Sequence, residues 1–272
     1  MSLVSTEWLD NNHSEVKIID ASWHMPNTNR NAYEEYKKEH IKNAIFFDID
    51  KFSNKKTELP HMLPNEEEWE KIVSNLGITN EDRIIVYDNS DVISSCRCWY
   101  TFIFFGHNPN LISVLNGGLL KWKKENRETT NKVSNHEKKN YKAIKISHLV
   151  KSKEEIDKNI LEKKFQVVDA RSKNRFLGLE KEPRQDVRSG SIQNSYCLPF
   201  GELINPEDKT FIEKNLIKKK FTNIGINNKN NIVFSCGSGI TAAVLGLAYS
   251  IINDKYLPAV YDGSWAEYGK IK

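Results

Sequence analysis

Cys236 is the residue whose type and neighbours point most directly to chemistry in this chain. Residues 231–234 before it have the pattern of a short buried strand, and the apolar residues 241–249 after it have that of a helix. Gly237 and Gly239 allow the intervening loop to turn tightly and to direct its backbone N–H groups inward. These donors, with the positive end of the helix dipole, would stabilise a thiolate, the nucleophilic form of cysteine. The sequence therefore predicts a covalent reaction on the sulfur of Cys236.

Two arginines could hold an anionic substrate for such a reaction. Arg175 and Arg184 lie nine residues apart in a predicted loop that follows an apolar strand at residues 167–171. A guanidinium group is planar and forms two parallel hydrogen bonds with a carboxylate, so arginine suits recognition of this anion. Arg171 ends the same strand and is expected to brace the sheet, while Arg188 has no predicted role.

The elements that must position these residues occur twice along the chain. Residues 18–22 match residues 167–171, and residues 116–118 match residues 262–264. A third match joins the apolar strand that ends at Asp88 to the strand before Cys236. The matched segments are about 145–150 residues apart, which is the size of an ordinary domain.

Each copy alternates short β-branched segments with helical patterns. This alternation is typical of an α/β fold in which a mainly parallel sheet is flanked by helices. We predict an N-terminal domain at residues 1–125 and a C-terminal domain at residues 146–272. Residues 126–145 are rich in Lys, Asn, Glu and Thr with little apolar periodicity, so they are predicted to form a linker.

The two copies differ where the reactive thiol would stand. The first copy has residues 88–91, Asp-Asn-Ser-Asp, where the second has residues 235–238, Ser-Cys-Gly-Ser. Cys96 and Cys98 come later, in or near the following helix, and are expected to be ordinary buried thiols. We therefore expect the first copy to be catalytically inactive and to serve as a scaffold.

The segment Cys-Gly-Ser-Gly-Ile-Thr at residues 236–241 resembles the active-site loop of the rhodanese-like sulfurtransferases, and most closely their 3-mercaptopyruvate branch. The tandem arrangement is similar too, so the resemblance covers essentially the whole chain. It implies that Cys236 is the nucleophile and that the other loop residues help bind substrate, namely Gly237, Gly239, Ile240 and Thr241. The Arg-Phe at Arg175 and the Glu-Pro-Arg at Arg184 resemble the family motifs that hold the substrate's carboxylate and carbonyl.

The same resemblance extends to a segment of the first copy. Asp-Ile-Asp ending at Asp50 and His-Met-Leu-Pro starting at His61 are similar to a family segment that reaches the active site. By this resemblance Asp50 and His61 act with Ser238 on Cys236 and orient a proton relay. A histidine is suited to that task because its unperturbed pKa lies near 6.5.

The implied reaction takes sulfur from 3-mercaptopyruvate, forms a persulfide on Cys236 and releases pyruvate. The outer sulfur then passes to cyanide or to a thiol acceptor such as thioredoxin, and no metal or organic cofactor is implied. Thiosulfate sulfurtransferase is the nearest alternative, but relatives that prefer this dianion place basic residues after the cysteine, where Gly237 and Ser238 are neutral. A non-catalytic module that only carries persulfide sulfur is a third possibility.

Other cysteine and loop chemistries fit poorly. A cysteine-dependent phosphatase needs an arginine six residues after the cysteine, where this chain has Ala242, and the loop lacks the lysine of a nucleotide-binding P-loop. One departure from the family concerns residues 190–195, Gly-Ser-Ile-Gln-Asn-Ser, where Gly-His-Ile-Pro-Gly-Ala is common. Loss of the proline and the second glycine would change the rigidity of this turn.

Composition and cysteine spacing limit the ligands and the cellular compartment to be expected for this chain. The 272 residues are 39% hydrophobic and 28% charged with a net charge of +4, so neither nucleic-acid binding nor membrane insertion is indicated. The four cysteines have no Cys-x-x-Cys spacing, and the first residues lack the pattern of a secretion signal. These features lead us to expect a cytoplasmic protein with reduced thiols.

Overall fold

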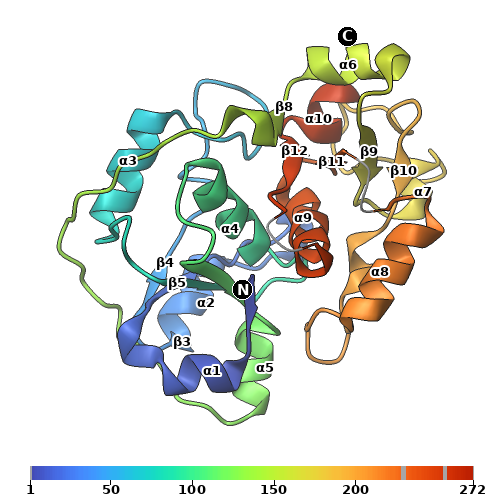
Figure 1. Ribbon diagram of the computed structural model, residues 1–272. Helices are drawn as coiled ribbons and strands as arrows, with labels where there is room; N and C mark the ends of the chain where they lie inside the picture. The colour runs from blue at the N-terminus through green and yellow to red at the C-terminus, as the bar shows by residue number, and fades with distance from the viewer. Residues whose placement is uncertain (1, 228–230, 254–255, 272) are drawn as a thin grey trace. The chain divides into compact units, whose positions relative to one another are not determined.

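A computed structural model describes residues 2–227, 231–253 and 256–271 (Figure 1). The chain forms two compact units. The N-terminal unit comprises residues 1–54, 64–146 and 206–211, and the C-terminal unit comprises residues 55–63, 147–205 and 212–272. Among the described residues, no helix is long and apolar enough to cross a membrane.

The N-terminal unit is built on a parallel sheet with the strand order β1-β6-β5-β2-β4. Its strands are β1 (Leu3–Val4), β2 (Lys17–Asp20), β4 (Ala44–Phe46), β5 (Ile84–Tyr87) and β6 (Ile112–Leu115). Its helices are α1 (Thr6–Asn11), α2 (Ala32–Lys38), α3 (Glu66–Asn75), α4 (Ser95–Phe104) and α5 (Gly118–Lys124). The interior strands β5 and β6 are buried along their whole length, and all of their residues except Ser113 are hydrophobic, as expected for strands covered on both faces.

The C-terminal unit repeats this arrangement with the order β8-β12-β11-β9-β10. Its strands are β8 (Val150–Lys151), β9 (Gln166–Asp169), β10 (Tyr196–Cys197), β11 (Ile232–Ser235) and β12 (Ala259–Tyr261). Its helices are α6 (Lys153–Glu162), α7 (Lys173–Phe176), α8 (Lys214–Asn223), α9 (Ile240–Ile252) and α10 (Ser264–Tyr268). The predicted α/β class and the internal duplication are confirmed.

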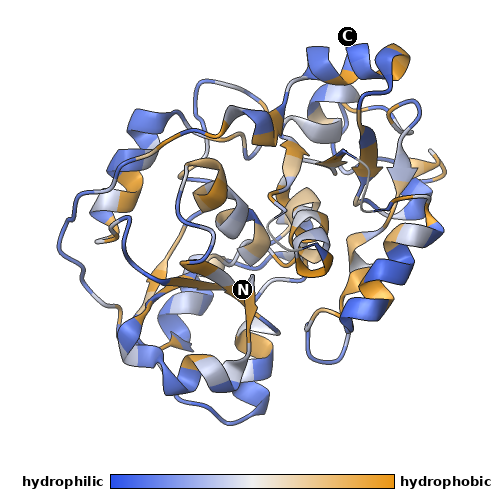
Figure 2. Cartoon of the chain, viewed as in Figure 1, coloured by the Kyte–Doolittle hydropathy of each residue, from blue (hydrophilic) through white to orange (hydrophobic). Residues whose placement is uncertain are grey.

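Local sequence signals account for the helix boundaries and faces. Ser152 caps α6, because its hydroxyl accepts from the Glu155 N–H while the Glu155 carboxylate accepts from the Ser152 N–H. Helix α9 is apolar over nearly its whole length, and Figure 2 shows it as largely hydrophobic, whereas α8 is hydrophobic along one side only. This difference follows from burial, since ten of the thirteen residues of α9 are buried and only Ile217 and Phe221 are buried in α8.

Two short segments belong to a different unit from the one that their position in the sequence suggests. Residues 55–63, from the first half of the chain, are part of the C-terminal unit. Residues 206–211, from the second half, are part of the N-terminal unit. The boundaries predicted at residues 125 and 146 miss both segments, because neither has an apolar periodicity that would reveal what it packs against.

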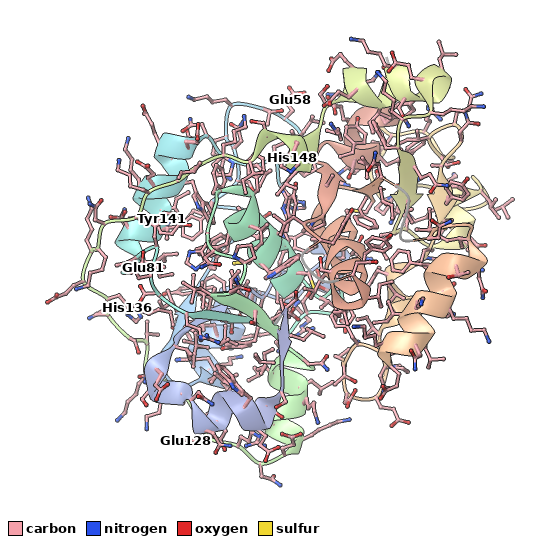
Figure 3. All side chains as sticks on the ribbon, in the orientation of Figure 1. Glu58, Glu81, Glu128, His136, Tyr141 and His148 are labelled. Atoms are coloured by element: carbon pink, nitrogen blue, oxygen red, sulfur yellow. The ribbon has the colours of Figure 1, made fainter. Side chains whose placement is uncertain are left out.

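The predicted linker differs from expectation as well, since residues 126–145 are part of the N-terminal unit. Strand β7 (Thr129–Thr130) pairs with β3 (His40–Ile41). Tyr141, labelled in Figure 3, is buried, and its N–H donates to the Ser74 hydroxyl at 3.1 Å. Further backbone N–H groups of this segment donate to carboxylates of α3, so it is held by hydrogen bonds that need no apolar pattern.

Candidate active site

Cys236 follows β11 directly and lies in the loop before α9 (Figure 1). The Gly239 N–H donates to its sulfur at 3.1 Å. Gly239 has φ 81°, a left-handed conformation that glycine adopts without a Cβ clash, and this conformation turns the loop back over the sulfur. The Cys236 residue is only 2% exposed, so an anion on its sulfur would be held by the amide and the N-terminal end of α9.

The backbone of the loop is fixed by the turn that follows β12. The Cys236 N–H donates to the Ser264 hydroxyl at 3.1 Å, and the Cys236 carbonyl accepts from the Trp265 N–H at 2.9 Å. The Gly237 carbonyl accepts from the Ala266 N–H at 2.9 Å. Three hydrogen bonds with residues 264–266 therefore hold Cys236 and the residue after it.

His61 and Ser238 are brought together within the C-terminal unit. The His61 Nδ1 lies 2.9 Å from the Ser238 hydroxyl, and both residues are buried. The segment that carries His61 is anchored two residues later, where the Leu63 N–H donates to the Asp262 carboxylate at 2.8 Å. At its other end Glu58, labelled in Figure 3, pairs with Lys270 at 3.1 Å.

Arg175 lies against the cysteine loop. A Cβ placed on Gly237 would be 3.3 Å from the Arg175 Nη2, so a side chain there would crowd the guanidinium. Arg175 donates through Nε and Nη2 to the Glu182 carboxylate at 3.2 and 2.5 Å. Glu182 therefore fixes the plane of a guanidinium group beside Gly237, the residue that follows Cys236.

Glu182 also accepts from Arg171 at 2.7 Å, so one carboxylate serves two arginines. Arg171 donates further to Asp169 at 2.7 Å and to the Gly190 carbonyl at 2.8 Å, which are the contacts of a sheet-end brace. Burial alone would lower the pKa of Arg171, but the Asp169 and Glu182 carboxylates outweigh burial and raise it. The two carboxylates and two guanidinium groups form one charge-balanced cluster.

The departure at residues 190–195 leaves the turn intact. Asn194 stands at the position of the family's second glycine and has φ 62°, a left-handed conformation that asparagine tolerates. The Ser195 N–H and hydroxyl both donate to the Ile192 carbonyl, at 3.2 and 2.6 Å. These bonds close the turn that proline would otherwise stiffen.

The other predicted binding residues are less closely tied to the sulfur. Arg184 is half-buried, and its side chain has no ion pair with any residue that the structure describes. Ile240 is buried and Thr241 is half-buried, and they are the first two residues of α9. Asp50 belongs to the N-terminal unit, where its carboxylate accepts from the Trp23 indole at 2.9 Å. Its predicted part in a relay stays a prediction.

The N-terminal unit has the same loop with a carboxylate in place of the thiol. Tyr87 pairs with Asp20 in the register in which Ser235 pairs with Asp169, so Asp88, the next residue, corresponds to Cys236. The alignment drawn from the sequence, which set Asp88 against Ser235, is wrong by one residue, because it lacked this strand register. The Asp88 carboxylate accepts from the Ser90 and Ser95 N–H groups, and burial raises its pKa.

The three other cysteines, Cys96, Cys98 and Cys197, are free thiols. Cys96 and Cys98 are buried in α4, and burial raises the pKa of each well above the usual value. Burial also raises the pKa of Cys197 to about 12. Thiols with such pKa values are poor nucleophiles near neutral pH. Within the described part of the chain, no group of three or more His, Cys, Asp or Glu side chains could hold a metal ion.

Three residues at this site were not found from the sequence. They are Glu182, which joins Arg175 to Arg171, Asp262, which anchors the His61 segment, and Ser264, which binds the Cys236 amide. The sequence did contain one indication for Asp262 and Ser264. They differ from Asn116 and Gly118, the residues at the matching positions of the first copy, so the two copies differ here as they do at the cysteine.

Comparison with known proteins gives one family. The model of the rhodanese-like domain matches residues 5–125 and again residues 152–270. The chain is 37% identical to thiosulfate/3-mercaptopyruvate sulfurtransferase 1, mitochondrial, of Arabidopsis thaliana, over 98% of this chain and 75% of that protein. It is 35% identical to thiosulfate sulfurtransferase of Rattus norvegicus, over 98% of this chain and 91% of that protein.

A solved structure gives the same result. SseA from Escherichia coli, described with the rhodanese fold and catalytic mechanism of 3-mercaptopyruvate sulfotransferases, superimposes with a TM-score of 0.87 at 29% identity. The match covers 97% of this chain and 99% of that one. The similarity therefore extends over both units and is not confined to the cysteine loop.

Proposed function

This chain belongs to the rhodanese-like family, and from that premise we propose that it is a sulfurtransferase that uses 3-mercaptopyruvate as its sulfur donor. The observation that carries the proposal is the environment of Cys236: a buried thiol with a loop amide on its sulfur, at the start of an apolar helix, with neutral residues on either side. Such an environment stabilises a thiolate without filling the loop with fixed cations.

The first half-reaction uses the thiolate as a nucleophile. The Cys236 sulfur attacks the sulfur of 3-mercaptopyruvate, a sulfur–sulfur bond forms and the carbon–sulfur bond breaks. The bonding electrons leave on carbon as pyruvate enolate, which takes up one proton to become pyruvate. Cys236 is left as a persulfide, and the second half-reaction transfers its outer sulfur to an acceptor and regenerates the thiolate.

Arg175 and Arg184 are the proposed holders of the donor. Arg175 is already oriented by Glu182 beside Gly237, and its side chain is 19% exposed, so part of the guanidinium can face a ligand. Arg184 lies in the same part of the chain with no ion pair among the described residues, so its charge is available for the donor's carboxylate or carbonyl.

His61 and Ser238 are proposed to handle the proton that the enolate needs. The 2.9 Å contact between them makes a continuous hydrogen-bonded pair two residues from the nucleophile. A proton could reach the loop along this pair, because an imidazole can donate a proton from one ring nitrogen and accept one at the other. Asp50 is assigned to the relay on the resemblance alone.

The choice between the two donors that relatives are named for rests on the charge of the loop. Thiosulfate carries two negative charges, and a loop cation about 5 Å away would contribute about 3 kcal/mol to its binding for each of these charges, at an effective dielectric constant of 20. Gly237, Ser238, Gly239 and Ile240 supply no such cation. 3-Mercaptopyruvate carries one carboxylate, for which an arginine pair outside the loop is sufficient.

For the acceptor we propose cyanide in the assay and a protein thiol such as thioredoxin in the cell. A cytoplasmic location is proposed on the four free cysteines, which are usual in reducing compartments. Cell fractionation would test this, since the name of one relative includes the word mitochondrial.

The deciding experiment is steady-state turnover with 3-mercaptopyruvate and with thiosulfate, using cyanide as the acceptor and Cys236→Ser as the control. We expect pyruvate release with 3-mercaptopyruvate, a much lower rate with thiosulfate and no turnover by the serine variant. A preference for thiosulfate would assign the alternative donor. A wild-type protein that accepts persulfide sulfur from a partner but releases no pyruvate would be a sulfur-carrying module.

A further inference from the structure

Ser264 has a backbone conformation that its residue type disfavours. Its φ is 49°, in the left-handed region, where a side chain with a Cβ is strained. The residue is fully buried, at 0% exposure, so the surrounding protein holds it in this conformation. A non-glycine residue held in this region by its surroundings is often part of a functional site.

The duplicated unit shows what the turn itself requires. Leu119 donates its N–H to the Asp88 carbonyl at 2.9 Å, as Trp265 does to the Cys236 carbonyl at 2.9 Å. The residue before Leu119 is Gly118, which has φ 52° and so matches Ser264 in conformation as well as in place. Both units need the left-handed conformation here, and in the N-terminal unit glycine supplies it without strain.

The serine at this position therefore adds something that glycine cannot, and the added group is a hydroxyl. It accepts from the Cys236 N–H at 3.1 Å and donates to the Tyr261 carbonyl at 2.8 Å. The second bond orients the first, because it directs the lone pairs of the oxygen toward the amide. The hydroxyl thus connects the end of β12 to the first residue of the nucleophile loop.

We propose that Ser264 is a positioning residue for the sulfur-transfer reaction: its hydroxyl holds the Cys236 amide, and so holds the nucleophilic sulfur in register with the Gly239 N–H. The inference rests on the proposed function, since it assumes Cys236 as the nucleophile. Ser264 itself contacts no reacting atom. In the N-terminal unit the residue equivalent to Cys236 is Asp88, which has no sulfur to position, and Gly118 suffices at the position of Ser264.

Two variants separate this positioning from an effect on folding. Ser264→Gly and Ser264→Ala both remove the hydroxyl, but only Ser264→Gly relieves the backbone strain. We expect the glycine variant to melt at a higher temperature than the alanine variant. We expect both to show the same loss, about five- to tenfold, in the rate of the pyruvate burst, the size of effect that one hydrogen bond supports. The KM for 3-mercaptopyruvate should stay unchanged.

Alkylation of Cys236 by iodoacetamide gives a readout that needs no substrate, and the rate constant should fall by a similar factor in both variants. Ser250→Ala is the matched control, because Ser250 is a buried serine of α9 whose hydroxyl donates to the Gly246 carbonyl at 2.9 Å. It should lower the melting temperature without changing either rate.

Burst and alkylation rates of Ser264→Gly equal to those of the wild type would overturn the proposal, as would rates that simply follow the melting temperatures. If the wild type releases no pyruvate, the proposed function fails. The alkylation rates still decide whether Ser264 positions the thiol.

Discussion

Replacing Glu182 by glutamine tests whether Arg175, the arginine beside the Cys236 loop, is oriented by a buried carboxylate. The Glu182 side chain is 3% exposed and is shared by Arg171, 1% exposed, and Arg175, 19% exposed. Glutamine keeps the shape but offers one acceptor oxygen, and its NH₂ group must face one of the two guanidinium groups. Arg175 can turn toward water and Arg171 cannot, so we expect the oxygen to stay with Arg171 and Arg175 to be released.

The magnitude follows from these contacts. Arg171 keeps the Asp169 carboxylate and the Gly190 carbonyl, so the cluster is weakened and not destroyed. Loss of hydrogen bonds to a charged group costs about 1.5–3 kcal/mol of unfolding free energy. For a chain of this length that corresponds to a fall in melting temperature of about 3–5 °C. An unaligned Arg175 should also raise the KM for 3-mercaptopyruvate about tenfold, equivalent to about 1.4 kcal/mol.

The assay combines thermal unfolding with steady-state kinetics, and Glu202→Gln is the matched control. Glu202 is likewise shared by two cations, Lys220 at 2.7 Å and Lys173 at 3.7 Å, but its side chain is 32% exposed. Exposed pairs of this kind contribute about 0–1 kcal/mol, so the control should change little. An unchanged melting temperature and a lower KM for Glu182→Gln would refute the reasoning. Glu182 would then act only by reducing the positive charge of Arg175 that attracts the donor, and not by orienting its guanidinium.

Three shorter predictions concern other buried groups. Burial raises the pKa of Asp20 to about 6 from 3.8, so the folded state holds its proton longer and stability is lost as pH rises from about 4 to 6. Asp20→Asn should therefore gain up to about 3 kcal/mol relative to the wild type across that window, measured by urea unfolding at both pH values. At pH 8, iodoacetamide should leave the three other cysteines of the native protein unmodified, which mass spectrometry of Cys236→Ser would show directly. Asp262→Ala should release the His61 segment, with increased proteolysis at residues 55–63 and a lower kcat. Asp262→Asn keeps an acceptor for the Leu63 N–H and should retain the segment.

The parts of the fold that could be predicted are those with a local signal. The strand before Cys236, the glycine loop and the apolar helix α9 are contiguous, and each has its own pattern of burial. The duplication was visible because the same local patterns recur. The equivalence of Asp88 and Cys236 was missed by one residue. The register of each strand is set by its pairing with β2 or β9 and not by the sequence of the strand itself.

The contacts that could not be predicted are those made by backbone groups. Residues 126–145 have the composition of a linker, yet the N–H groups of Ala143 and Lys145 donate to glutamates of α3 at 3.1 and 3.0 Å. Any residue except proline could make such bonds, so the sequence of the segment carries little trace of them. The ion pair between Arg175 and Glu182 was missed for a different reason: each residue was recognised as part of a motif, but neither motif shows that the two side chains bind each other.

Residues 55–63 and 206–211, which each belong to the unit formed mainly by the other half of the chain, are equivalent to each other. Their sequences did not reveal this equivalence. The Leu63 N–H donates to Asp262 at 2.8 Å, and the Phe211 N–H donates to Asn116 at 2.9 Å, with Asp262 and Asn116 in matching turns. Two residues before each donor, His61 and Lys209 both have φ 60°.

The duplication therefore includes these segments, although their side chains do not resemble one another. Lys209 pairs with Asp91 in the N-terminal unit, whereas His61 binds Ser238 in the C-terminal unit. The loops after β5 and β11 have the same backbone arrangement and differ in the side chains around them. The C-terminal unit has a thiol, a histidine and a serine hydroxyl where the N-terminal unit has a carboxylate, a lysine and a glycine. On the proposed function, activity would depend on a few side chains placed by backbone contacts that both units keep. A cysteine alone at position 88 would then lack the equivalents of the Ser264 hydroxyl and of His61.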